Sequence, residues 1–333
     1  MPPLLVKVAT CSLDQWALDF AGNLGRIKQS VREARAAGAR YRVGPELEIP
    51  GYGCEDHFLE ADTVAHSWDA LAALLRDEEL TRGMLVDVGM PLMHRGVRYN
   101  CRVFLLDRRV VLVRPKAHLA DDGNYRESRY FAAWARPLGA PLEALELPEC
   151  VQRATLPLGQ ATAPIGLGVL ASADGVRVAS ESCEELFVSN SPGVALALAG
   201  ADIISNGSGS HHQLRKLETR VRLMQGFSAK CGGVYVYANQ QGCDGGRLYF
   251  DGCAMVLANG ECVAQGSQFS LRDVETLVAT VDLDEVRSFR ASLASRSVQA
   301  AQLPAAATAP VVALDGFGLG VGWRPHAAAG ALN

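Results

Sequence analysis

Three side chains that could act together in catalysis stand directly after predicted strands. Glu46 follows Gly-Pro, Lys116 follows Arg-Pro, and Cys183 lies within the segment ESCEE. Functional sites of α/β proteins are usually built where strands end. A nucleophilic thiol needs a base that takes its proton and a cation that stabilises the charge formed after attack. Glu46 as the base and Lys116 as the cation would complete such a site around Cys183.

A histidine base is the alternative. His211 and His212 come after a predicted strand that ends at Ser205, so they too could serve a thiol. Histidine is the commoner base near neutral pH, and the residues alone therefore slightly favour a Cys–His pair over Cys–Glu–Lys. His57 and His118 fall in predicted loops. A serine nucleophile is less favoured because the sequence has no GxSxG motif.

The elements that must position these residues alternate between strands and helices. Apolar patterning predicts strands over Leu4–Thr10, Tyr41–Val43, Met84–Met90, Asn100–Leu106, Val110–Pro115, Val176–Ser180, Ala201–Ser205, Val234–Asn239, Tyr249–Leu257 and Thr276–Leu283. It predicts helices over Asn23–Ala37, Asp62–Arg76, His211–Cys231 and Leu283–Ser295. Because hairpin-like pairs are interspersed, the pattern favours a layered α/β fold with a mixed sheet. Residues Arg136–Pro157, with four prolines, are expected to form a surface excursion.

Charge and cysteine usage exclude several classes of protein. The 333 residues include 32 Lys plus Arg and 36 Asp plus Glu, a net charge of −4, so neither a nucleic-acid footprint nor a polybasic membrane patch is expected. No apolar run is long enough for a transmembrane helix, and the first residues do not read as a signal peptide. Nine widely spaced cysteines without a CxxC motif predict reduced thiols in the cytoplasm and no zinc or other metal site.

Seven segments form a collinear pattern: VATCSLDQWALDFAGNLGRI, GARYRVGPELEIPGYGCEDHF, VGMPLMHRGVRYNCRVF, RPKAHLADDGNYRESRYF, CEEL, SNGSGSHHQLRK and ANQQGCDGGRLYFDGCAM. The pattern resembles the nitrilase, or carbon–nitrogen hydrolase, superfamily. Within it, the pattern resembles the glutaminase domain of eukaryotic-type glutamine-dependent NAD synthetases. The resemblance covers residues 4–295 and implies a four-layer α-β-β-α sandwich. Nitrilase-type domains pack as homo-oligomers, so a homo-oligomer is expected.

The resemblance also implies roles for individual residues. By motif position Cys183 is the nucleophile, Glu46 the general base and Lys116 the oxyanion stabiliser, which overturns the preference for a Cys–His pair. Glu127, in NYRESRYF, matches a second glutamate that supports the lysine. Glu48 lies two residues after Glu46, but only the glutamate directly after proline matches the motif.

The implied reaction is hydrolysis of the side-chain amide of L-glutamine through a thioester, without a cofactor. The resemblance assigns Glu184 to the α-amino group of glutamine, Ser208 and Arg215 to its α-carboxylate, and Tyr125 to the pocket wall. Ser205 and Ser210 in the same segment offer the same chemistry as Ser208. Two alternatives remain: a free-standing amidase for another small amide or nitrile, and a non-catalytic scaffold of a synthetase oligomer.

The sequence departs from the family pattern in three places. Ser182 stands where the family has a hydrophobic residue, and Phe187 replaces a tryptophan. No SGGxDS-type loop of an ATP-dependent synthetase domain occurs, so ATP and Mg²⁺ are expected only for a synthetase domain or partner that would receive the ammonia. Residues 296–333 are rich in alanine and are expected to form a flexible tail; their GFGLGVG stretch is a weak nucleotide-loop candidate because no predicted strand precedes it.

Overall fold

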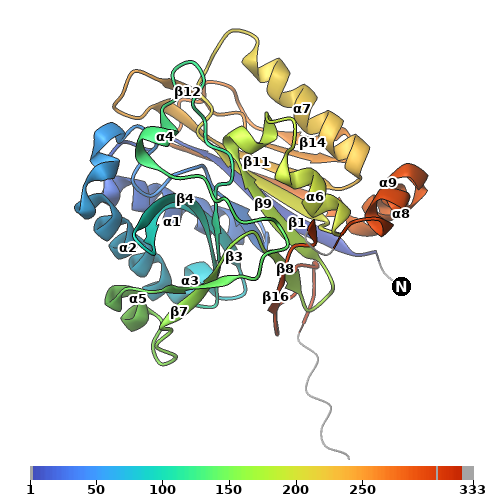
Figure 1. Ribbon diagram of the computed structural model, residues 1–333, viewed down its shortest axis with the longest axis horizontal. Coiled ribbons are helices and arrows are strands. Elements are labelled where there is room, and N and C mark those ends of the chain that lie inside the picture. Colours follow the sequence, from blue (N-terminus) through green and yellow to red (C-terminus); the bar gives the residue numbers. More distant parts are fainter. Residues whose placement is uncertain (1–2, 305–306, 325–333) are drawn as a thin grey trace, which may run out of the picture.

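The computed structural model describes residues 3–304 and 307–324 and shows a curled sheet covered by helices (Figure 1). The strands are β1 Leu5–Leu13, β2 Tyr41–Val43, β3 Leu85–His94, β4 Val97–Leu106, β5 Arg109–Pro115, β6 Glu143–Glu146, β7 Thr162–Ile165, β8 Val169–Ser172, β9 Arg177–Ser182, β10 Ile203–Ser208, β11 Val234–Cys243, β12 Tyr249–Asp251, β13 Met255–Ala258, β14 Glu261–Gln265, β15 Val274–Asp282 and β16 Val311–Leu314. The helices are α1 Phe20–Ala36, α2 Ala61–Arg76, α3 Glu78–Thr81, α4 Glu127–Tyr130, α5 Glu149–Ala154, α6 Pro192–Leu198, α7 Lys216–Cys231, α8 Leu283–Ser292 and α9 Ala294–Ala301, with the 3-10 helices η1 Glu55–Leu59 and η2 Cys183–Leu186.

Three clusters of buried apolar side chains define four layers. The first lies between the helix layer of α1 and α2 and the inner strands, and includes Ile27, Leu71 and Val88. The second lies between the two halves of the sheet and joins side chains of β1, β2 and β4 to those of β9, β10 and β11. The third packs α6 and α7 against the second half of the sheet. Figure 1 shows α1 and α2 on one side of the strands and α6 and α7 on the other. The predicted four-layer α-β-β-α sandwich is therefore confirmed.

The order of the strands brings three loops to one place. Along the sheet it reads β16-β8-β9-β10-β11-β1-β2-β3-β4-β5-β7-β6, so β2, β5 and β9 belong to different parts of the curled sheet. β2 pairs in parallel with β1 and β3, β9 pairs in parallel with β10, and β4 pairs antiparallel with β5. Because the two halves pack face to face, the segments that follow β2, β5 and β9 converge between them.

Two predicted elements are shorter than expected. The long helix begins at Lys216 and not at His211, because residues 211–215 form a turn in which His211 bridges to Phe250 and Arg215 takes a left-handed backbone conformation (φ +66°). The predicted strand Tyr249–Leu257 is interrupted between β12 and β13, and both pieces pair antiparallel with β11.

The prediction of a surface excursion over Arg136–Pro157 is wrong. The segment contains β6, which pairs antiparallel with β7, and α5, which packs on α2. Leu145, Leu147 and Val151 point from these elements into the first core cluster. Four prolines did not prevent this, because none stands where a backbone N–H is needed: three lie outside both elements, and Pro148 is the N-cap of α5, where its carbonyl accepts from Val151 (3.0 Å).

The expected flexible tail is also corrected over much of its length. α9 continues to Ala301, and β16 adds a parallel edge strand to β8. Phe317 and Leu319 are buried in the cluster between the two sheet halves, and the amide of Val321 donates to the carbonyl of Leu5 (2.7 Å). The GFGLGVG stretch therefore packs against the sheet; residues 305–306 and 325–333 of the predicted tail lie outside the described residues.

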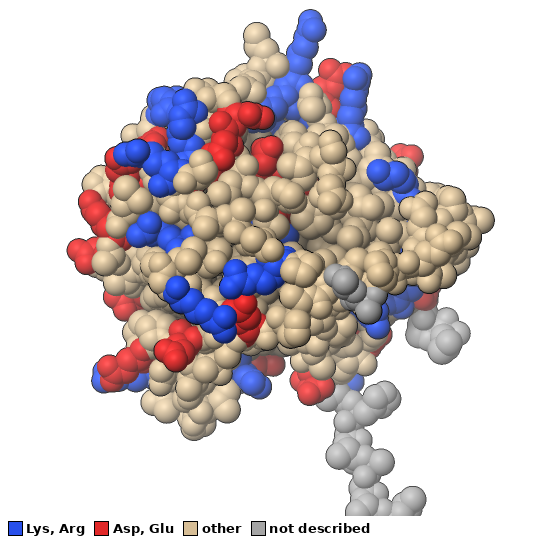
Figure 2. Space-filling view, in the orientation of Figure 1, with Lys and Arg blue, Asp and Glu red and all other residues tan. Residues whose placement is uncertain are grey.

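The surface carries both signs of charge. On the face shown in Figure 2, Lys and Arg side chains alternate with Asp and Glu, in keeping with the net charge of −4. Among the helices in the described ranges, none combines the length and the apolar character that crossing a bilayer requires.

Candidate active site

Glu46 is held in the loop after β2 by backbone and side-chain contacts. Arg102, fully buried on β4, donates to the carbonyl oxygens of Gly44 and Pro45 (both 2.7 Å) and forms an ion pair with Asp87 (2.8 Å). The side-chain amide of Gln240 donates to the backbone carbonyl of Glu46 (3.0 Å). These contacts fix the turn, so the Glu46 carboxylate projects into the space between the sheet halves.

A buried ammonium joins two carboxylates at the centre of the site. Lys116, the first residue after β5, donates from Nζ to Oε1 of Glu46 (2.6 Å) and to Oε1 of Glu127 (2.8 Å). All three side chains are at most 3% exposed. The two carboxylates raise the pKa of Lys116 well above its ordinary value against the effect of burial, so the lysine is charged. Burial raises the pKa of Glu127 to about 7, while the ammonium of Lys116 opposes that rise.

Both carboxylates have further donors. Glu46 accepts from the side-chain amide of Asn100 (2.8 Å) and from the amide of Gly209 (3.2 Å). Glu127 accepts from the hydroxyl of Tyr52 (2.5 Å) and from the amide of Ala120 (3.0 Å). Sequence analysis did not identify Asn100 or Tyr52 as site residues, since a lone amide or phenol has no spacing signal that ties it to a distant carboxylate.

Cys183 begins the short helix η2 directly after β9. Its backbone has φ +36°, a left-handed conformation that a residue with a side chain rarely adopts. Its amide donates to Oδ1 of Asn206 (3.0 Å), so that N–H is already engaged and is not free to bind a developing oxyanion. Strain of this kind at a reactive side chain is typical of functional sites, where the surrounding structure maintains it.

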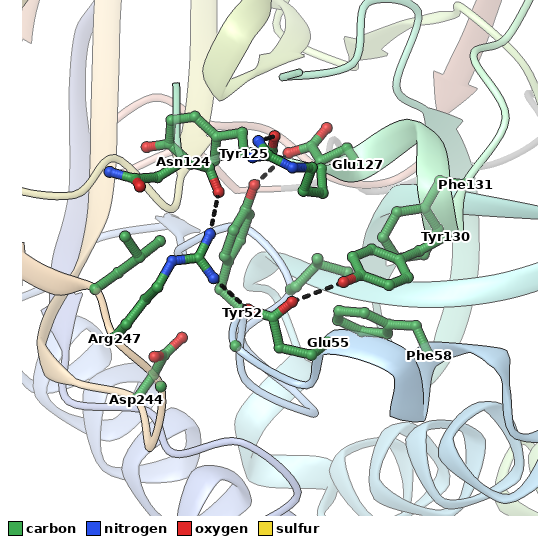
Figure 3. A pocket seen from close by; sticks show the side chains of 15 residues that line it. Tyr52, Glu55, Phe58, Asn124, Tyr125, Glu127, Tyr130, Phe131, Asp244 and Arg247 are labelled. Atoms are coloured by element: carbon green, nitrogen blue, oxygen red, sulfur yellow. Dashed lines mark hydrogen bonds and ion pairs between the residues drawn. The ribbon is translucent and has the colours of Figure 1, made fainter. Parts of the chain in front are cut away.

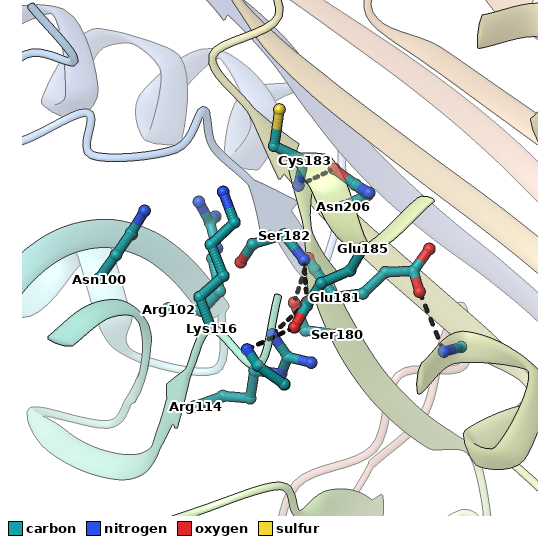
Figure 4. A network of polar contacts seen from close by, with 12 residues as sticks. Asn100, Arg102, Arg114, Lys116, Ser180, Glu181, Ser182, Cys183, Glu185 and Asn206 are labelled. Atoms are coloured by element: carbon teal, nitrogen blue, oxygen red, sulfur yellow. Dashed lines mark hydrogen bonds and ion pairs between the residues drawn. The ribbon is translucent and has the colours of Figure 1, made fainter. Parts of the chain in front are cut away.

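The thiol is protonated before reaction and is within the field of the buried charges. Burial, together with the carboxylate of Glu46, raises the pKa of Cys183 to about 12, while the ammonium of Lys116 lowers it. Figure 4 shows the Lys116 side chain and Cys183 on the same side of the polar network that lies around the ends of β5 and β9. The structure thus brings Glu46 and Lys116 within electrostatic reach of Cys183, although the three residues are far apart in the chain.

A cavity of about 240 Å³ opens next to the thiol. Three charged residues line it: Asp122, Glu184 and Lys216. Its other walls are formed by Gly123, Tyr125, Cys183, Phe187, Ser210, His211 and Gln213. Glu184 is half-buried, and burial raises the pKa of its carboxyl. Lys216 Nζ donates to the hydroxyl of Tyr125 (3.3 Å) and lies 5.2 Å from the centre of its ring. Two carboxylates, Asp122 and Glu184, and one ammonium, Lys216, therefore line the same small cavity.

The structure places only some of the predicted pocket residues on this cavity. Glu184 and Tyr125 line it. Ser208 is fully buried and donates to Oδ1 of Asn206 (2.9 Å), and Arg215 is exposed on the turn before α7; neither lines the cavity. Their neighbours Ser210 and Lys216 do. The difference follows from the backbone: β10 ends at Ser208, so Ser210 lies in the loop beyond it, and Lys216, the first residue of α7, lines the cavity beside Cys183.

The histidines do not act as partners of the thiol in this structure. His211 lines the cavity, but its Nδ1 is 2.7 Å from the hydroxyl of Tyr125 and its amide donates to the same oxygen (3.1 Å). Burial and the nearby Lys216 lower the pKa of His211 to about 4, so its ring is neutral. The ring of His212 packs against Phe269 away from the cavity lining. The neutral His211 ring thus shares its Nδ1 with Tyr125, whereas the charges of Glu46 and Lys116 both act on the Cys183 thiol, which favours the Glu–Lys–Cys alternative.

A second, smaller cavity of about 30 Å³ is lined by Tyr125 and Glu127 (Figure 3). Arg247 lies at this cavity, donating to the carbonyl of Asn124 (2.7 Å) and pairing with Glu55 (3.4 Å). Tyr125 therefore lines both cavities.

A Glu–Lys–Cys site between the halves of a four-layer sandwich defines a class of protein that cleaves carbon–nitrogen bonds. The sequence model of the family described as carbon-nitrogen hydrolase matches residues 7–291, and the chain belongs to that family.

The chain is also similar to particular proteins. It is 55% identical over 295 residues to the glutamine-dependent NAD(+) synthetase of Dictyostelium discoideum and 54% identical over 297 residues to that of Homo sapiens. These alignments cover 89% of this chain but 40% and 41% of those proteins, so the chain spans about two fifths of their length. A glutamine-dependent NAD(+) synthetase from Cytophaga hutchinsonii has a similar structure, with a TM-score of 0.72 and 25% identity over 83% of this chain and 43% of its own. An amidase of the nitrilase superfamily from Nesterenkonia shares the fold, with a TM-score of 0.62 and 18% identity over 88% of this chain and 97% of its own.

Proposed function

We propose that the chain hydrolyses the side-chain amide of L-glutamine and releases ammonia and glutamate. One observation carries this substrate: the cavity beside the Cys183 thiol is lined by the ammonium of Lys216 and by carboxylates, the half-buried Glu184 and the exposed Asp122. An α-amino acid carries an ammonium and a carboxylate, and these protein charges of both signs complement them. We therefore infer that Glu184 binds the α-amino group, and that Lys216 with Ser210 takes the place expected of Arg215 and Ser208 at the α-carboxylate.

The proposed reaction has two halves. Glu46 accepts the proton of the Cys183 thiol as sulfur attacks the amide carbon, and Lys116 stabilises the negative charge that develops on the amide oxygen. The carbon–nitrogen bond breaks, and the nitrogen leaves as ammonia with the proton from Glu46. Glu46 then takes a proton from water, which attacks the thioester; the carbon–sulfur bond breaks, the thiol regains its proton and glutamate is released.

The similarity to glutamine-dependent NAD(+) synthetases supports glutamine as the substrate and a synthetase domain or partner as the recipient of the ammonia. ATP and Mg²⁺ would belong to that synthetase. Assembly into a homo-oligomer and a cytoplasmic location stay predictions.

The test compares L-glutamine with its des-amino analogue, in which the α-amino group is replaced by hydrogen. Both amides would react at the same thiol, but only glutamine would use Glu184. We expect ammonia release from the analogue to fall at least tenfold in kcat/KM, and Cys183→Ala to abolish release from both. Equal rates for both amides would favour a general amidase. No turnover, together with no labelling of Cys183 by an electrophilic glutamine analogue, would favour a scaffold.

A further inference from the structure

The strands that carry Lys116 and Cys183 are not hydrogen-bonded to each other, so strand pairing does not directly set the distance between the two side chains. Lys116 follows β5 and Cys183 follows β9, and six strands separate β9 from β5 in the order of the sheet. Their distance therefore depends on contacts made across the two packed halves. Reaction rates are sensitive to such distances, because a displacement of about 1 Å can reduce a rate roughly 100-fold.

One buried carboxylate spans this gap. Glu185, fully buried in η2, accepts from the amide of Ser182 (2.6 Å) and from the amide of Ala117 (2.6 Å). Ser182 directly precedes the nucleophile, and Ala117 directly follows the lysine. The same carboxylate pairs with Arg114, two residues before Lys116 on β5. Figure 4 shows these groups converging on Glu185 from both strands.

We propose that Glu185 is a positioning residue, which holds the Cys183 turn against the end of β5 and so fixes the lysine relative to the nucleophile. The activity readout of this proposal rests on the proposed glutaminase function. Glu185 does not line the cavity, so it acts through Ser182 and Ala117 and not on the substrate.

The site requires a carboxylate and not a neutral side chain. Two backbone N–H groups and one guanidinium all donate to the two oxygens of Glu185. An amide has one oxygen and one NH₂ group, so glutamine would turn a donor toward another donor. Within the described part of the chain, Nε and Nη2 of Arg114 have no hydrogen-bond partner, so Arg114 depends on this carboxylate for its pairing.

The first experiment compares Glu185→Gln with Glu181→Gln. Glu181 is a matched control, because it is also a fully buried carboxylate close to the nucleophile. It lies on β9 and accepts from Ser191 (2.8 Å), from the amide of Gly193 (3.0 Å) and from the hydroxyl of Tyr235, but not from β5. With L-glutamine, we expect kcat of Glu185→Gln to fall roughly 100-fold with KM within threefold of the wild-type value. We expect kcat of Glu181→Gln to stay within threefold.

The second readout is the rate of alkylation of Cys183 by iodoacetamide at pH 8, which needs no turnover. Because Lys116 favours the thiolate, loosening its position in Glu185→Gln should lower this alkylation rate, while Glu181→Gln keeps the wild-type rate. If Glu185→Gln does not fold, Glu185→Asp keeps the charge but is one methylene too short to reach both amides, and the same changes are expected for it.

The outcomes separate the two proposals. Wild-type kcat and alkylation rate in the folded Glu185 variants would overturn the positioning role, as would equal changes in Glu181→Gln. A wild-type protein that leaves glutamine intact, with an alkylation rate that still falls in Glu185→Gln alone, would overturn the glutaminase function but retain the positioning role.

Discussion

Replacing Lys116 by methionine tests the charge balance at the centre of the site. Methionine has a similar length but no charge, so the variant would leave the carboxylates of Glu46 and Glu127 buried together without the ammonium that binds both (2.6 and 2.8 Å). Removing one partner of a buried ion pair costs about 3–5 kcal/mol of folding free energy. Losing one group that stabilises an oxyanion costs roughly 100- to 1,000-fold in kcat. We expect both losses in Lys116→Met.

The loss of stability should depend on pH in a known direction. Without the ammonium, burial would raise the folded-state pKa of Glu127 further above its value in the unfolded chain. Groups with raised folded-state pKa values bind protons more tightly in the folded protein, so stability falls as pH rises. At pH 8 the full cost of about 3–5 kcal/mol is expected. At pH 5 the carboxyl of Glu127 binds a proton at little cost, and the deficit should shrink toward that of the lost hydrogen bonds, about 1–3 kcal/mol.

Urea unfolding of wild type and Lys116→Met at pH 5 and pH 8 measures both deficits, and glutamate release measures the catalytic loss. Lys216→Met is the matched control. It also removes a partly buried ammonium, but this ammonium lines the cavity beside Cys183 and donates to Tyr125, not to Glu46 or Glu127. Its deficit should change little between the two pH values. A Lys116→Met protein as stable as wild type at pH 8, or one whose deficit is larger at pH 5, would refute the charge balance described here.

Three further predictions test the other parts of the site and fold. Burial raises the pKa of Glu127 to about 7, and ionisation of its carboxyl adds a negative charge beside the catalytic ammonium. The kcat/KM of the wild-type protein should therefore fall as pH rises through about 7. Glu127→Gln should keep measurable activity but lack this fall. A wild-type profile in Glu127→Gln would assign the fall elsewhere. Lys216→Met should raise KM for glutamine more than tenfold, whereas the exposed Arg215→Met should leave it unchanged, and the reverse result would restore the prediction from sequence. Phe317→Ala should cost about 3–5 kcal/mol in urea unfolding, because its ring is buried between the sheet halves; a loss below about 1 kcal/mol would show that residues 307–324 do not pack there.

The fold class was predictable because its signal is carried by long patterns. Alternating strands and helices indicated a mixed α/β sheet, and the collinear motifs indicated four layers. The failures came from short elements. β6 has one buried position, Leu145, and its other three residues are exposed or partly exposed. No hydrophobic periodicity is detectable over four such residues. Phe317 and Leu319 dock as single apolar side chains between glycines, and such anchors become evident only when the surface that receives them is known.

The site was predictable to the extent that each residue stands at a strand end. Glu46, Lys116 and Cys183 each follow one, and their motifs could be read without coordinates. The pocket residues depend on local backbone geometry instead. Ser208 and Ser210 have the same chemistry, and the end of β10 between them decides which one reaches the cavity.

The buried arginines of the site are better explained by position than by stability. Arg102 pairs with Asp87 and holds the Glu46 turn, while Arg114 pairs with Glu185 beside the nucleophile. Buried ion pairs contribute little net stability, since desolvation offsets most of the attraction, and well-packed apolar pairs are often as stable or more so. Their directional bonds to backbone groups, however, do what apolar contacts do not: they fix where a strand end lies relative to a strand in the other half of the sheet. The catalytic geometry, more than the fold, is what these buried charges maintain.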